Sequence, residues 1–204
     1  MIAIVNYNMG NLHSVKKVLD KLQVRNSITN NPKEIQRAER IILPGVGHFG
    51  MAMQHLKNLD ILPVLNEAAF EKKIPILGIC LGMQLMTEGS DEGGENGLGW
   101  FSCRTEKMNV KNHLNFKIPH IGWNTLNHAE NNTILENVPN KSEVYFVHSY
   151  GVINAPEEEI LTTTDYEFTF ISSLRKSNLV GMQFHPEKSH NIGSQLINNF
   201  IHLT

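Results

Sequence analysis

The chain is poor in cysteine and has no excess of basic residues, and each scarcity narrows its function. Two cysteines in 204 residues allow at most one disulfide, which favours two reduced thiols in the cytosol over a disulfide-stapled secreted domain. The 18 Lys and Arg against 20 Asp and Glu give a net charge of −2, which argues against a nucleic-acid groove or an anionic-membrane surface. Apolar runs are too short for a membrane span, and the first residues lack the charged segment of a signal peptide. We therefore expect a cytoplasmic protein with no nucleic-acid or membrane partner.

The distribution of apolar residues predicts one α/β domain over residues 1–204. Hydrophobic residues form 41% of the chain and charged residues 19%, which is ordinary for a globular domain of this length. In the first half, short apolar runs at 2–7, 40–47 and 74–79 alternate with helical patterns, and this order predicts a mostly parallel open sheet with helices on both faces. In the second half, closely spaced strand patterns predict additional antiparallel strands, and the segment 190–203 predicts a terminal helix.

The stretch "GICLG" places Cys80 between two glycines where a predicted strand turns into a helix. A strand-to-helix elbow of this form holds a nucleophile in strained backbone geometry at the carboxyl edge of a sheet, where α/β proteins place their ligands. A helix amino terminus also favours thiolate over thiol. A lone cysteine is more often a structural one, but this context favours a nucleophile.

The stretch "QFHPEKS" provides a candidate base. Pro186 biases His185 toward an extended backbone, in which Glu187, two residues on, points to the same side as the imidazole. A carboxylate in that place fixes the tautomer of the histidine and stabilises its cation, as the third member of a catalytic triad does. A turn with a solvated salt bridge would explain the motif equally well if it stood alone.

The glycine loop "LPGVGHFG" at 43–50 follows another predicted strand. It has no Walker lysine, so a P-loop type of phosphate-binding role is disfavoured. We interpret it as a backbone loop whose N–H groups, at Val46 and Gly47, face a developing oxyanion together with the N–H of Leu81. The ten histidines show no zinc-like spacing, so we expect neither a metal nor a cofactor.

Six motifs together resemble those of the class I, triad-type glutamine amidotransferases. In chain order they are "YNMGNLHSV", "LPGVGHFGMAM", "GICLGMQLM", "PHIGWN", "YFVHSY" and "QFHPEKS". "GICLGMQ" with "FHPE" is specific to the class, and "PGVG", "PHIGWN" and "FVHSY" resemble the glutaminase subunits of imidazole glycerol phosphate synthase in histidine biosynthesis. The resemblance implies a flavodoxin-like fold and a Cys80–His185–Glu187 triad that hydrolyses glutamine to glutamate and ammonia.

The resemblance also implies a glutamine site and a partner. The residues expected to bind glutamine are Gly45, Gly47, Gln84, Glu92, Ser149 and Tyr150. Ammonia would pass to a separate synthase (cyclase) subunit, a (β/α)8 barrel that forms a heterodimer with this chain and makes imidazole glycerol phosphate and AICAR. The residues that match family positions at or near that interface are Asn11, His120, Trp123, Tyr145 and Lys188.

Departures from the usual pattern leave other functions open. They lie at Asn6, Asn8, Gly151 and Glu167, outside the triad. A paralogous branch that supplies ammonia for amidating a surface-polysaccharide sugar shares the same glutaminase residues and is the close alternative. A free-standing γ-glutamyl hydrolase is an alternative of another class, against which "PHIGWN" and the glycine loop argue. A non-catalytic binding protein is disfavoured because every triad member is present.

Overall fold

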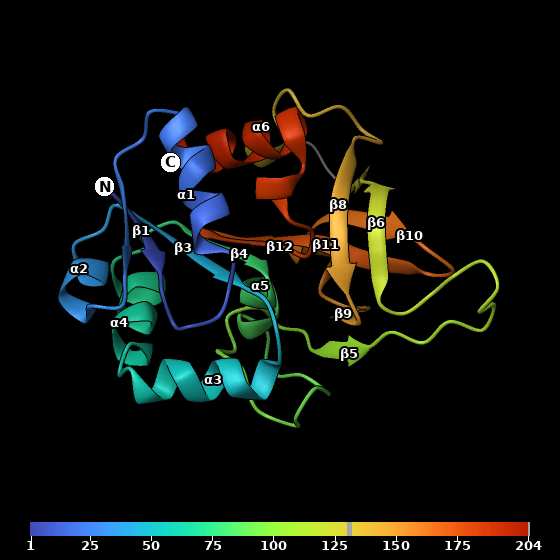
Figure 1. Cartoon of the computed structure of the whole chain (residues 1–204), viewed down its shortest axis with the longest axis horizontal. Coiled ribbons are helices and arrows are strands. Elements are labelled where there is room, and N and C mark those ends of the chain that lie inside the picture. The colour runs from blue at the N-terminus through green and yellow to red at the C-terminus, as the bar shows by residue number, and fades with distance from the viewer. Residues whose placement is uncertain (130–131, 204) are drawn as a thin grey trace.

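A mixed β-sheet with helices on both faces forms the centre of the molecule (Figure 1). The structure is a computed structural model and describes residues 1–129 and 132–203. The main sheet runs in the order β2-β1-β3-β4-β12-β11-β10-β7. Its strands are β1 (Ile2–Val5), β2 (Asn26–Thr29), β3 (Arg40–Gly45), β4 (Ile76–Cys80), β7 (Asn127–His128), β10 (Ile160–Asp165), β11 (Thr169–Lys176) and β12 (Leu179–Met182).

The sheet changes character along its width. From β2 to β12 every neighbouring pair is parallel, whereas β12, β11, β10 and β7 pair antiparallel. The short strand β9 (Tyr150–Val152) pairs with β11, and β5 (Thr105–Lys107) pairs with β9. A separate two-stranded sheet is formed by β6 (His120–Thr125) and β8 (Glu143–His148). The predicted parallel sheet with antiparallel additions is confirmed.

Alternating strand residues supply two cores, one on each face of the sheet. Ala3 and Val5 face the helices of the lower part of Figure 1, and Ile2 and Ile4 face the other side, as period-two alternation requires. The first face is covered by α2 (Pro32–Gln36), α3 (Phe49–Asn58), α4 (Leu62–Asn66), the π-helix Glu67–Glu71 and α5 (Leu81–Leu85). The second face is covered by α1 (Leu12–Lys21) and α6 (His190–Ile201).

The arrangement of β4 and β12 brings the predicted triad to one sheet edge. These strands are parallel neighbours, with Leu179 opposite Ile76 and Met182 opposite Ile79. Cys80 at the end of β4 and His185, three residues beyond β12, therefore emerge together. Within the described ranges, no helix has the length and apolar character needed to span a bilayer.

Candidate active site

The elbow predicted around Cys80 is present. Cys80 ends β4 and precedes α5 with φ +53° and ψ −109°, a conformation that residues with a side chain rarely adopt. The helix begins so close to β3 that a Cβ at Gly82 would lie 1.7 Å from the carbonyl oxygen of Leu43. Glycine is therefore required at 82 if α5 is to start here, and the start of α5 sets the position of the thiol.

The thiol is almost buried and contacts two polar groups. Cys80 is 5% exposed, and its Sγ lies 3.9 Å from the Val147 carbonyl oxygen and 3.7 Å from Nε2 of Gln183. No role was predicted for Gln183 from the sequence. The available signal was its place in "QFHPEKS", two residues before His185 and thus on the same side of an extended segment.

His185 and Glu187 form the predicted pair, although the backbone between them differs from the expectation. Nδ1 of His185 lies 2.7 Å from Oε1 of Glu187, and their side chains are 1% and 2% exposed. Pro186–Lys188 forms a 3₁₀ turn rather than an extended segment, so the expected side-chain alternation is wrong for these residues. The turn brings the Glu187 carboxylate to the His185 imidazole, so the predicted contact forms although the predicted backbone geometry does not.

The surroundings of His185 favour its cation. Burial alone would lower the pKa of His185, but hydrogen bonding and charge at Cys80 and Glu187 outweigh burial and raise it to about 9. Nε2 of His185 has no hydrogen-bond partner among the described residues, although Cys80 is near enough to raise this pKa. This nitrogen is therefore available to hold a proton taken from the thiol.

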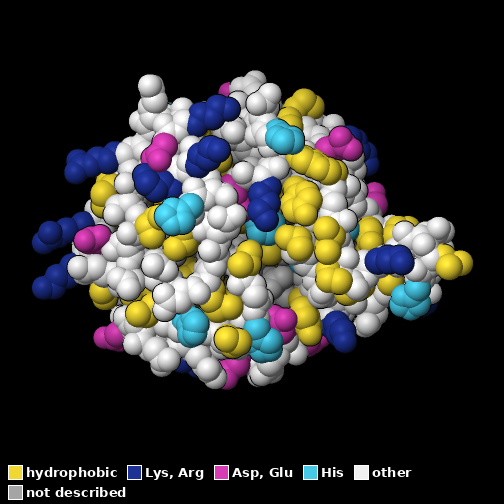
Figure 2. Space-filling model, viewed as in Figure 1, with side chains coloured by type: hydrophobic (Ala, Val, Ile, Leu, Met, Phe, Trp, Pro, Cys, Tyr) yellow, Lys and Arg dark blue, Asp and Glu magenta, His cyan; other side chains and the backbone are white. Residues whose placement is uncertain are grey.

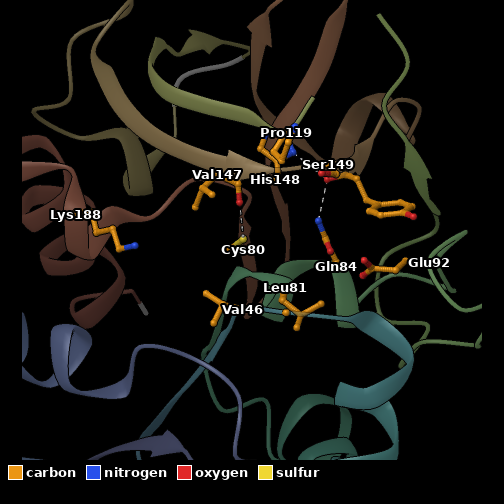
Figure 3. Close-up of a pocket in the computed structure, with 12 residues that line it drawn as sticks. Val46, Cys80, Leu81, Gln84, Glu92, Pro119, Val147, His148, Ser149 and Lys188 are labelled. Atoms are coloured by element: carbon orange, nitrogen blue, oxygen red, sulfur yellow. Dashed lines mark hydrogen bonds between the residues drawn. The ribbon is translucent and has the colours of Figure 1, made fainter. Parts of the chain in front are cut away.

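A cavity of about 430 Å³ opens beside the thiol (Figure 3). In that view Val147, His148 and Ser149 lie on one side, and Val46 and Leu81 on the other. The lining residues are Val46, Gly47, Cys80, Leu81, Gln84, Glu92, Pro119, Val147, His148, Ser149, Tyr150 and Lys188. The structure thus brings the predicted oxyanion donors and most of the predicted glutamine-binding residues to one cavity.

The predicted oxyanion donors line the same cavity as Cys80. Leu81 is the first residue of α5, where a backbone N–H has no acceptor within its own helix. Val46 is 39% exposed at the cavity, and Gly47 has φ +109°, which favours glycine. Gly45 does not line the cavity: a Cβ there would lie 2.2 Å from the Tyr7 hydroxyl, so this glycine packs against a buried side chain.

Two polar side chains that line the cavity already form hydrogen bonds within the protein. Nε2 of Gln84 lies 2.9 Å from the Tyr150 carbonyl oxygen and 3.0 Å from Oε1 of Gln183. Both amide hydrogens are therefore used, and the carbonyl oxygen of Gln84 remains for a ligand. Oε2 of Glu92 accepts from the backbone N–H of Phe49 at 2.8 Å, which fixes the carboxylate at the cavity.

Two neutral histidines support the wall formed by residues 148–150. Nδ1 of His148 donates to the Tyr150 carbonyl oxygen at 2.9 Å, so Nε2 of His148 accepts from Nδ1 of His120 at 3.1 Å. Burial lowers the pKa of His148 to about 3 and that of His120 to about 4. His120, predicted at or near a partner interface, is only 3% exposed and lies behind the outer face of β6.

The outer face of β6 and β8 carries exposed apolar side chains. Ile121 is 60% exposed and Trp123 46% exposed, and the Trp123 ring contacts Tyr145 with centroids 5.9 Å apart. The ammonium of Lys188 lies 5.6 Å from the centre of the Tyr145 ring. Figure 2 shows apolar side chains gathered over the centre and right of this view. We name Ile121, Trp123 and Tyr145 the β6–β8 outer face.

Asn11, the remaining residue predicted for the interface, caps α1. Its side chain accepts from the backbone N–H of Ser14 at 3.3 Å. The preceding Gly10 packs against Pro44 at the end of β3, so this loop lies at the same sheet edge as the cavity. In the described ranges, no three His, Cys, Asp or Glu side chains are grouped so as to hold a metal ion.

Comparison with known proteins places these features in one family. The family described as glutamine amidotransferase class-I matches residues 3–203. The chain is 46% identical over 201 residues to "Imidazole glycerol phosphate synthase subunit HisH 2" of Methanococcus maripaludis, with 98% of each chain covered. It is 44% identical over 204 residues to "Imidazole glycerol phosphate synthase subunit HisH 1" of Campylobacter jejuni, with each chain fully covered.

Solved structures share the fold at lower identity. A crystal structure titled glutamine amidotransferase has a TM-score of 0.77 at 16% identity, and the match covers 100% of this chain and 98% of that one. The structure of PurLQS from Thermotoga maritima has a TM-score of 0.75 at 18% identity, with 98% and 97% covered. At such identities the likeness concerns the fold alone.

Proposed function

The chain belongs to the class I glutamine amidotransferase family, and on this premise we propose that it is the glutaminase subunit of an imidazole glycerol phosphate synthase of histidine biosynthesis, acting in the cytoplasm. Relatives that carry this name match it over their full lengths at 39–46% identity. One observation carries the chemistry: Cys80 stands on a strained elbow at a cavity, beside a buried His185–Glu187 pair.

The first half of the reaction transfers the glutamyl group to the enzyme. The thiol proton of Cys80 moves to Nε2 of His185, and the thiolate attacks the side-chain carboxamide carbon of glutamine. The resulting oxyanion is stabilised by backbone N–H groups of Leu81 and of the loop at Val46 and Gly47. His185 then protonates the amide nitrogen, the C–N bond breaks, and ammonia leaves a thioester on Cys80. Glu187 stabilises the imidazolium throughout.

The second half releases glutamate. His185, now neutral, accepts a proton from water as the water oxygen attacks the thioester carbon. The C–S bond breaks, the sulfur regains its proton from His185, and glutamate departs. We expect the carbonyl oxygen of Gln84 and the carboxylate of Glu92 to bind the head group of glutamine, together with Ser149 and Tyr150, which line the same cavity.

Ammonia must then reach an acceptor on another chain. We propose a separate cyclase subunit, a (β/α)8 barrel, that forms a heterodimer by covering the β6–β8 outer face, the cavity edge at Lys188 and the loop that ends at Asn11. The exposed apolar side chains of Ile121 and Trp123 support this choice, because clusters of large exposed apolar side chains commonly form the centre of protein interfaces.

The decisive experiment is purification of this chain with its partner from the source cell, followed by assays of both. Alone, the chain is expected to hydrolyse glutamine slowly, because the glycines of the Val46–Gly47 loop permit a peptide orientation that points no N–H at the oxyanion until the partner docks. The partner with its ligand should then accelerate hydrolysis by about 10²–10³-fold, which is the effect of one added oxyanion donor. Full activity in the isolated chain would contradict the proposal and favour the free-standing γ-glutamyl hydrolase.

A second candidate function is the one that the sequence motifs left open. A paralogous glutaminase that supplies ammonia for amidation of a surface-polysaccharide sugar would use the same Cys80, His185 and Glu187. The purified complex distinguishes the two: formation of imidazole glycerol phosphate supports the first function, and amidation of a sugar nucleotide supports the second.

A further inference from the structure

We propose that Gln183 is a catalytic residue of this site. Its side-chain amide donates a hydrogen bond to the Cys80 sulfur, which stabilises the thiolate and fixes its position. The proposal deepens the proposed function and rests on it for the reaction, but the contact itself is structural. Nε2 of Gln183 lies 3.7 Å from Sγ of Cys80, within hydrogen-bonding distance for sulfur. Gln183 is fully buried, so water does not compete for this amide.

The orientation of the Gln183 amide follows from its neighbours. The Tyr150 carbonyl oxygen can only accept, so the Gln84 atom 2.9 Å from it must be the nitrogen. That same nitrogen lies 3.0 Å from Gln183, whose facing atom must therefore be the oxygen. The remaining atom of the Gln183 amide, directed at the sulfur, is then the NH₂ group. The Tyr150 carbonyl oxygen thus determines which atom is oxygen and which is nitrogen in both side-chain amides.

The backbone of Gln183 is also held in place. Its N–H donates to the Ser172 carbonyl oxygen at 2.9 Å, which ties the segment after β12 to the middle of β11. The donor consequently sits on the sheet, opposite the elbow that holds Cys80. A donor built on rigid elements loses little entropy when it stabilises a charge.

The two contacts of the sulfur suit its two protonation states. A thiol can donate its hydrogen to the Val147 carbonyl oxygen, 3.9 Å away, whereas a thiolate can only accept. When the proton moves to Nε2 of His185, the Val147 contact is lost and the Gln183 N–H becomes a charge-assisted hydrogen bond. Gln183 therefore favours the ionised sulfur specifically, and it complements the imidazolium of His185 from another direction.

The test measures the ionisation of Cys80 without glutamine or a partner. Alkylation of Cys80 by iodoacetamide is followed against pH, and the modified cysteine is identified by peptide mass spectrometry. In Gln183→Met, which keeps the length of the side chain and removes the donor, alkylation of Cys80 near pH 6.5 should slow by about 10- to 100-fold, because less of the sulfur is ionised without the donor. Gln183→Glu should slow alkylation at least as much, because a carboxylate repels the thiolate.

A matched control removes the same amide elsewhere. Gln36 donates to Glu67 from the exposed end of α2, and Gln36→Met should leave the alkylation profile of Cys80 unchanged. Near-ultraviolet circular dichroism reports whether each variant retains native packing. The side chain of Gln183→Glu has the same shape and still accepts from Gln84, so this variant can be used for the test if Gln183→Met does not fold.

The outcomes separate this proposal from the proposed function. An unchanged alkylation profile of Cys80 in a folded Gln183 variant would overturn the role of Gln183, whatever happens to glutamine hydrolysis. Slower alkylation of Cys80 in the variants, combined with a wild-type complex that does not hydrolyse glutamine, would overturn the proposed function and leave the role of Gln183 intact.

Discussion

The two cysteines of the chain occupy equally buried positions with opposite chemical prospects. Cys80 and Cys103 are each 5% exposed. Cys80 lies beside His185 and the Gln183 amide, both of which stabilise a thiolate. Around Cys103, burial and then the charges of Glu159 and Glu88 raise the pKa of the thiol to about 12. Burial therefore does not decide whether a thiol is reactive; the charges and donors around it do.

The buried histidines also show that neighbouring groups, rather than burial alone, decide the protonation state of a side chain. His185, His120 and His148 are all at most 6% exposed. The pKa of His185 rises because Cys80 and Glu187 stabilise its cation, despite its burial. Burial lowers the pKa of His148, and the hydrogen bond from His148 to the Tyr150 carbonyl oxygen offsets only part of this effect, because no carboxylate among the described residues lies beside the ring to stabilise its cation. One group is equipped to carry a proton and the other to stay neutral.

The largest effect should separate the two thiols directly. Cys80→Ser is expected to lower glutamine-dependent activity of the complex by at least about 10⁴-fold, because it removes the nucleophile of a triad. Cys103→Ala should change this activity by less than about threefold, because Cys103 lies outside the cavity and contacts no reacting group. Steady-state glutaminase assays of the complex, with the fold checked by circular dichroism, make the comparison.

The same variant tests the division of labour between the subunits. With ammonium salt at alkaline pH, a complex that contains Cys80→Ser should still form product, because the proposed function assigns the acceptor chemistry to the partner chain. Loss of the ammonia-dependent reaction in an intact complex would show that Cys80 also acts in synthesis.

A smaller effect is expected at the carboxylate of the triad. Glu187→Gln should retain roughly 10²-fold more activity than Cys80→Ser, because it weakens the orientation of His185 without removing the attacking atom. It should also shift the alkaline fall in activity, expected near the His185 pKa of about 9, to lower pH, since less charge then stabilises the imidazolium. The pH dependence of kcat/KM checks this. Glu34→Gln on the exposed α2 is the control, and an identical alkaline limb in both variants would contradict the role of Glu187.

The neutral histidines should appear in the pH dependence of stability. His148 has a folded pKa of about 3 against a usual 6.5, so below pH 6.5 the unfolded state binds a proton that the folded state does not. The free energy of unfolding should therefore fall with decreasing pH by up to about 1.4 kcal/mol per pH unit for this group. Urea denaturation at pH 5–8 measures the slope. His148→Asn should flatten it, and the exposed His13→Asn should not; equal slopes in both would refute the assignment.

The smallest effect is expected around the unreactive thiol. The buried carboxylate of Glu159 accepts from the Ser102 backbone N–H at 3.1 Å and pairs with Lys176 at 2.7 Å. Because Lys176 is largely exposed, the ion pair contributes little, and Glu159→Gln should cost about 1–2 kcal/mol of unfolding free energy, mainly from the weakened hydrogen bond. The alkylation rate of Cys80 should be unchanged. A change in that rate would mean that the two thiol regions are coupled.

Local patterns in the sequence were sufficient to predict the elbow. Gly78 and Gly82 around Cys80, at the end of an apolar run, predict the strand-to-helix turn because strand, turn and helix are adjacent in the chain. The parallel sheet was equally predictable, since alternating strands and helices admit few arrangements. The contact between His185 and Glu187 was predicted from extended geometry, whereas a 3₁₀ turn forms it, because Pro186 can begin such a turn as readily as it ends a strand.

Contacts between distant segments were not predictable in the same way. Gln183 lies 103 residues from Cys80, and its amide is oriented by Gln84, which is in turn oriented by Tyr150. His120 carries the same motif signal as its neighbours, yet strand alternation turns it inward to His148 while Ile121 and Trp123 face solvent.

The sequence by itself determined the nucleophile, its elbow and the parallel half of the sheet, because these depend on residues within a few positions of one another. Only the tertiary structure decided which groups surround the sulfur and which histidine carries a charge. Those properties depend on burial and on partners that the strand order brings together, and the strands β4, β8 and β12 that supply them are widely separated along the chain.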